Sequence, residues 1–142
     1  MTLNEVPIHI NNLTDHEISF DVEEFIDKAI NELNITPTLL EFSFTNDSKI
    51  KEIHNTYMNL NTTTDVITFN LNTTTHPHGD IYICVDDAKR NAKELNHSLD
   101  FELKTLIVHA LLHLMGYTDT TDKSKKEMFL IQDRILEILT KK

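Results

Sequence analysis

The stretch 99–115 limits the fold more than any other part of the chain, because its pattern is that of a helix apolar on nearly every side. The main apolar stripe consists of Leu103, Leu106, Ile107, Ala110, Leu111 and Leu114. The opposite side is also apolar through Val108, Leu112 and Met115, and the one polar strip is Glu102, Thr105, His109 and His113. Such a helix has to be covered by other elements, so we expect it at the centre of the fold.

Two histidines on the polar strip of this helix predict a metal site. His109 and His113 are four residues apart, so both imidazoles leave the same helix face one turn apart. Buried imidazoles need partners, and one metal ion satisfies both, although histidines with a purely structural role are the alternative. Gly116 can end the helix, after which Asp119 can return as the third ligand. Two imidazoles and one carboxylate leave a position open for water, as in catalytic zinc sites.

The rest of the chain predicts an α+β fold with the element order βαβαββααα, a mixed four-stranded sheet and about five helices. The expected strands are 6–10, 39–45, 65–71 and 80–85, and the expected helices are 21–34, 49–60, 86–96, 99–115 and about 121–139. In the second helix we expect Tyr57 and Leu60 to face inward and His54 to face solvent. The length of 142 residues fits a single domain over 1–142.

The charge balance restricts how the chain can bind nucleic acid. It has 13 Lys and Arg against 23 Asp and Glu, a net charge of −10, whereas general nucleic-acid binders carry a basic surplus. Any nucleic-acid binding must therefore depend on a local site. The single cysteine, Cys84, fits a reducing compartment, and we see neither a secretory signal nor a membrane span, so a cytoplasmic protein is expected.

Three motifs resemble the YbeY family of metal-dependent endoribonucleases. The first is the segment 109–117 with its His-x-x-x-His-x-x-Gly-Tyr pattern, followed by Asp119 where the family usually has a third histidine. The second is 57–69, YMNLNTTTDVITF, and the third is 79–83, GDIYI. The resemblance implies an α+β fold, one divalent metal (most simply Zn²⁺), and maturation of the 3′ end of small-subunit ribosomal RNA together with ribosome quality control. It implies ribosomal RNA and the small ribosomal subunit or its proteins as partners, and neither DNA nor a membrane.

Two departures from the family pattern concern charge. Asp119 in place of histidine makes the metal site harder and one charge more negative. Met58 stands where the family commonly has an arginine that can clamp a phosphate. The cations considered as substitutes are Lys49, Lys51, Arg90 and Lys104.

Other polar residues near the expected strand ends are further candidates. Asp65 and Asp80 begin strands and could orient a ligand or a water molecule, although turn or capping roles explain them equally well. The Thr64 hydroxyl could bind phosphate. His76 and His78 are most simply surface residues of the loop between two strands.

Two other functions compete with the endoribonuclease. A zinc peptidase would need a glutamate directly after the first histidine, where this chain has Ala110, unless Glu102 took that role. A ribosome-assembly factor with a purely structural metal is the second alternative, which the missing arginine and the acidic composition favour.

Overall fold

The computed structural model describes residues 7–140, and its elements follow the order βαβαββααα. The strands are β1 (Ile8–Asn12), β2 (Leu39–Thr45), β3 (Val66–Asn70) and β4 (His78–Cys84). The helices are α1 (Val22–Leu33), α2 (Asp47–Met58), α3 (Val85–Leu95), α4 (Leu99–Leu114) and α5 (Asp122–Thr140). The expected α+β class and element order are confirmed, while the first strand begins at Ile8 and Val6 lies outside the described residues.

The four strands form one mixed sheet with the order β1-β2-β4-β3. β1, β2 and β4 are parallel, and β3 pairs antiparallel with β4 at the edge. β4 therefore lies inside the sheet although it follows β3 in the chain. This order puts the loop before β3 at one margin of the sheet, beside the end of α4.

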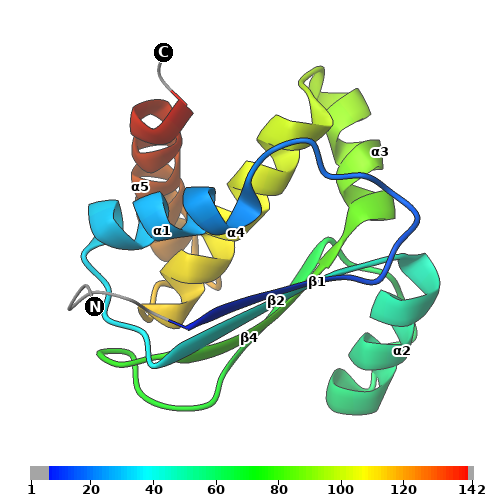
Figure 1. Cartoon of the computed structure of the whole chain (residues 1–142). Helices are drawn as coiled ribbons and strands as arrows, with labels where there is room; N and C mark the ends of the chain where they lie inside the picture. The colour runs from blue at the N-terminus through cyan, green and yellow to red at the C-terminus, as the bar shows by residue number, and fades with distance from the viewer. Residues whose placement is uncertain (1–6, 141–142) are drawn as a thin grey trace.

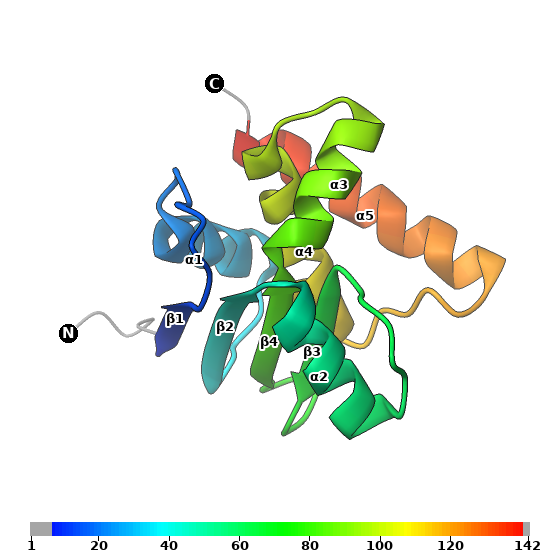
Figure 2. The same cartoon turned by 90° about the vertical axis from the view of Figure 1, so that its right-hand side faces the viewer.

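Helix α4 is the central helix of the fold, as its apolar pattern predicts. Figures 1 and 2 show α1, α3, α4 and α5 over one face of the sheet and α2 against the other. Leu103, Ile107 and Leu111 are fully buried in the main core. Gly79 of β4 lets this helix approach the sheet closely, because a Cβ there would lie 2.7 Å from Cδ1 of Leu114.

Helix α2 covers the other sheet face with fewer residues than its sequence suggests. Ile50 and Ile53 are buried, but Tyr57 is 67% exposed and Leu60 is 48% exposed, so the inward position expected for these two is wrong. His54, expected to face solvent, is buried instead. The helix ends at Met58, and the following loop folds back so that His54 Nδ1 lies 2.9 Å from the carbonyl oxygen of Thr62.

Candidate metal centre

The end of α4 shapes the chain that leads to the metal-site candidate. Ser98 caps the start of the helix by accepting a hydrogen bond from the Phe101 N–H. At the other end Gly116 has φ of 100°, a conformation that side chains with a Cβ rarely adopt. The Tyr117 N–H donates to the Leu112 carbonyl oxygen, which turns the chain back toward the histidine face. Asp119 then lies beside the two imidazoles, as the sequence predicts.

Three ligand atoms form a triangle of a size that fits one ion. His109 Nε2 and His113 Nε2 are 3.0 Å apart, and Asp119 Oδ2 lies 3.8 and 3.9 Å from them. A point equidistant from the three atoms lies about 2.1 Å from each, close to the bond lengths of zinc to imidazole nitrogen and carboxylate oxygen. The three side chains therefore fit a small divalent metal without rearrangement.

The outer nitrogens of both imidazoles have partners that fix the tautomers. His109 Nδ1 donates to Oε1 of buried Gln132 at 2.8 Å, and His113 Nδ1 donates to the Tyr117 carbonyl oxygen at 3.1 Å. With both outer nitrogens donating, the two Nε2 atoms face each other across 3.0 Å with lone pairs that a cation bound to both would stabilise. The sequence analysis missed Gln132, which comes from α5 and carries no local motif.

Burial keeps the His113 imidazole in the form that binds a metal. Desolvation, together with the neighbouring His109, lowers the pKa of His113, and the Asp119 carboxylate opposes this only in part. A lowered pKa keeps the ring neutral at pH 7, and the neutral ring is the form that binds metal. Asp119 is 43% exposed, so the triangle is open to solvent on the carboxylate side.

Two clefts meet at this triangle. The first, of about 460 Å³, contains His109, His113 and Asp119 together with Thr64 and Asp65. The second, of about 640 Å³, contains His109, Asp119 and Asp65 and extends toward α5. Residues that line the first cleft beyond these include His54, Met58, Thr68 and Asn70. The buried Thr68 hydroxyl has no hydrogen-bond partner within residues 7–140.

Asp65 lies beside the triangle, and Asp80 does not. Burial, followed by the charge of Asp87, raises the pKa of Asp65, and Asn91 Nδ2 donates to its Oδ2 at 3.3 Å. Asp80 lines neither cleft. It lies in β4 on the sheet face opposite α4, where it accepts a hydrogen bond from Tyr82 Oη at 3.1 Å. The alternation of Gly79, Ile81 and Ile83 toward the core already placed Asp80 on that other face.

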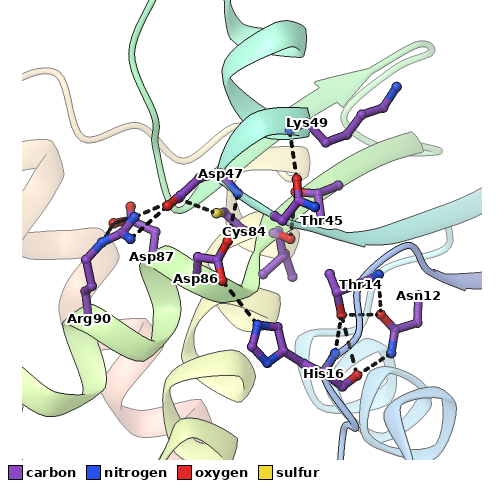
Figure 3. A network of polar contacts seen from close by, with 12 residues as sticks. Asn12, Thr14, His16, Thr45, Asp47, Lys49, Cys84, Asp86, Asp87 and Arg90 are labelled. Atoms are coloured by element: carbon purple, nitrogen blue, oxygen red, sulfur yellow. Dashed lines mark hydrogen bonds and ion pairs between the residues drawn. The ribbon is translucent and has the colours of Figure 1, made fainter.

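The cations considered as substitutes for the family arginine all lie elsewhere. Arg90 binds both oxygens of Asp47 and also Asp87, as Figure 3 shows. Lys104 lies over the rings of Phe20 and Phe25. Lys49 pairs weakly with Glu52, and neither it nor Lys51 lines the two clefts. His76 is an exposed loop residue outside both clefts, as expected, whereas His78 begins β4, is half-buried and also lies outside both clefts.

The network in Figure 3 includes a second group of potential ligands, Asp47, Cys84 and Asp86. Each already has a protein partner. Arg90 donates hydrogen bonds to the Asp47 carboxylate. The Asp86 carboxylate accepts a hydrogen bond from the Asp47 N–H and pairs with His16. Burial raises the pKa of Cys84 to about 12, so its thiol stays protonated and donates to Asp47. This group joins the starts of α2 and α3 and leaves no ligand free for a metal.

The position after His109 argues against a peptidase. Ala110 is fully buried, and its methyl group cannot take a proton from a water molecule. Glu102, the substitute base considered from the sequence, is buried and lies 2.6 Å from His97 Nε2. Its carboxylate is therefore already paired within the second cleft.

Comparison with known proteins decides the family. The family model described as Endoribonuclease YbeY matches residues 8–140. The chain belongs to the YbeY family. A family member from Nautilia profundicola is 38% identical over 133 residues, covering 93% of this chain and 91% of its own. One from Oenococcus oeni is 40% identical over 107 residues, covering 69% and 70%. Both relatives carry the name Endoribonuclease YbeY.

The fold also matches a solved structure. A solution structure from Thermotoga maritima superposes with a TM-score of 0.70 at 27% identity, covering 93% of this chain and 88% of that one. The resemblance to the YbeY family inferred from three motifs is thus confirmed over nearly the whole chain. None of the helices within residues 7–140 has the length and apolar character needed to cross a membrane.

Proposed function

We propose that this chain is a metal-dependent endoribonuclease that cleaves single-stranded ribosomal RNA at a zinc ion held by His109, His113 and Asp119. The endoribonuclease class agrees with the family match and with the names of the relatives. The observation that carries the metal assignment is the pair of Nε2 lone pairs 3.0 Å apart beside a carboxylate. Zinc fits a site of two imidazoles and one carboxylate with an open side.

Zinc in this site supplies a Lewis acid that acidifies water and offsets the charge that develops on a phosphate. The chain itself supplies the proton acceptor. Asp65 lies in both clefts beside the proposed metal ligands, where its carboxylate can accept a proton, and burial raises its pKa in the metal-free chain. We assign it to take the proton of the attacking water. The Thr64 hydroxyl at the first cleft donates to a phosphate oxygen.

The proposed biological setting is maturation of the small-subunit ribosomal RNA 3′ end in the cytoplasm, with the small subunit or its proteins as partners. Support comes from the family resemblance and from the open clefts. The acidic chain lacks a general attraction for RNA, so a partner on the ribosome that positions the RNA fits its charge of −10.

The test combines metal content with RNA cleavage. Zinc per chain is measured by elemental mass spectrometry for the wild type and for His113→Ala and Asp119→Ala, with the exposed loop variant His76→Ala as control. We expect near-stoichiometric zinc in the wild type and the control, and loss in the two ligand variants. Retention of zinc by both ligand variants would refute the three-residue site.

Cleavage of a single-stranded ribosomal RNA fragment is then followed with and without a chelator, while circular dichroism reports the fold. We expect zinc-dependent cutting that falls with Asp65→Asn. If the zinc-loaded, folded chain cuts no RNA, the endoribonuclease proposal is wrong for the isolated chain. The second candidate function, a metal-stabilised ribosome-assembly factor without catalysis, would then be preferred. Met58 favours this function, because it lines the first cleft in place of an arginine that could hold a phosphate.

A further inference from the structure

The substrate of an RNA-cleaving site needs a positive charge beside the metal, and the first cleft contains none. No Lys or Arg within residues 7–140 lines that cleft, and Met58 occupies the position where the resemblance predicts an arginine. The second cleft has a single Lys or Arg among its described lining residues, Lys125 of α5. Lys125 shares this cleft with His109 and Asp119, so it is placed next to the proposed metal site.

An exposed aromatic ring accompanies this lysine. Phe129 is one helical turn after Lys125, is 36% exposed and lines the same cleft. Its ring lies nearly parallel to the imidazole of His109, at 29° with 6.1 Å between centroids. The Lys125 ammonium lies 5.8 Å from the centre of the Phe129 ring. A cation and an aromatic ring at this spacing match the two groups of a nucleotide, its phosphate and its base.

We propose that Lys125 and Phe129 bind the nucleotide next to the scissile phosphate, with the base stacked on Phe129 and its phosphate paired with Lys125. The proposal rests on the endoribonuclease function, and it makes the substrate a single strand, because a base within a duplex cannot reach the ring. Lys125 of α5 thereby provides the positive charge that is absent from the first cleft, where Met58 replaces the family arginine. Stacking on a ring tolerates every base, so the site selects unpaired RNA and not a sequence.

The surrounding charges keep this site to one nucleotide. The second cleft is itself acidic apart from Lys125, with five carboxylates in its lining: Asp65, Glu94, Glu102, Asp119 and Asp133. A third cleft, of about 530 Å³, shares Lys125 and Phe129 and is lined by Asp122 and Asp133 as well. Carboxylates there repel further phosphates. With a net charge of −10 the rest of the surface adds no attraction, so the loss of one lysine has a large effect on binding.

The experiment measures binding and cleavage separately on the zinc-loaded protein. Binding is followed by fluorescence anisotropy with a labelled single-stranded 2′-O-methyl RNA, and cleavage with unmodified RNA of the same sequence. The variants are Lys125→Gln, Phe129→Leu and the conservative Phe129→Tyr. Lys28→Gln on α1 is the matched control, because it removes the same charge from an exposed surface pair with Glu24.

We expect Lys125→Gln and Phe129→Leu each to weaken binding at least about fivefold and to raise KM with little change in kcat or zinc content. Phe129→Tyr should bind as the wild type does, because it keeps a stacking ring. For Lys125→Gln the slope of log affinity against log salt should fall by about 0.7, the value for one lost phosphate contact on a single strand, and Lys28→Gln should leave it unchanged.

The outcomes separate this inference from the function on which it rests. If the wild type binds RNA without cleaving it, and Lys125→Gln and Phe129→Leu each weaken that binding, the nucleotide site is supported and the nuclease function is refuted. Cleavage with unchanged binding in Lys125→Gln and Phe129→Leu would refute the nucleotide site and leave the nuclease standing. An equal loss in Lys28→Gln, or no RNA binding by the wild type at low salt, would also overturn the nucleotide site.

Discussion

Gln132 allows the metal site to be tested through a residue that cannot itself bind the ion in this arrangement. Its Oε1 accepts the Nδ1 proton of His109 at 2.8 Å, and the residue is only 5% exposed. Gln132→Leu keeps a similar volume and removes the acceptor, so the buried His109 N–H loses its partner and the ring loses its fixed tautomer. Loss of such a partner lowers metal affinity by roughly 10- to 100-fold, equivalent to about 1.4–2.8 kcal/mol.

The assay is a competition titration of zinc against a chromophoric chelator at constant pH. Urea unfolding of the metal-free protein, measured in parallel, should show about 1–3 kcal/mol less stability in Gln132→Leu from the unpaired buried N–H. Gln132→Glu is the matched control, because its carboxylate still accepts the proton and makes His109 a stronger ligand. Wild-type zinc affinity in a folded Gln132→Leu variant would show that this hydrogen bond does not orient the ligand.

Three further predictions concern two glycines and the buried cysteine. Gly79→Ala should lower the free energy of unfolding by about 1–3 kcal/mol in urea titrations, because the new methyl group would meet Leu114 at 2.7 Å and Leu40 at 2.9 Å. A Cβ at Gly116 would have space, with the nearest atom at 3.5 Å, but φ of 100° is strained for alanine. Gly116→Ala should therefore lower the free energy of unfolding by about 1–3 kcal/mol. By moving the Asp119 segment it should also weaken zinc binding in the chelator titration. Cys84, with a pKa raised to about 12 by burial, should react with a thiol reagent at pH 8 only after unfolding, since its thiolate fraction there is on the order of 10⁻⁴. Because the unfolded thiol ionises first, stability should decline as pH rises from about 9 toward 12.

The sequence predicted those parts of the fold that depend on local periodicity. The apolar pattern of α4 identified the central helix, and the spacing of His109, His113 and Gly116 predicted that Asp119 lies beside the two imidazoles. Each of these follows from helix geometry alone. The hydrophobic patterns of the other segments predicted the order of strands and helices, which the structure confirms.

The residues that the sequence misplaced depend on contacts between distant segments. Gln132 meets His109 only because α5 packs against α4. His54 is buried because the loop at Thr62 folds over it, which no helical pattern can show. Asp80 shares a strand with core residues but points to the other sheet face, so its place in a family motif did not bring it near His109 and His113.

Helix α4 holds the two proposed histidine ligands on a buried element. Its backbone amides lie in the best-packed part of the core, so they should be protected from hydrogen exchange until the whole domain unfolds. His109 and His113 are attached to that helix and keep their spacing whether or not an ion is bound. Asp119 belongs to an exposed segment between α4 and α5. At the proposed site, we therefore expect uptake and release of zinc to involve local opening of this short segment, while the helix that carries the two histidines stays folded.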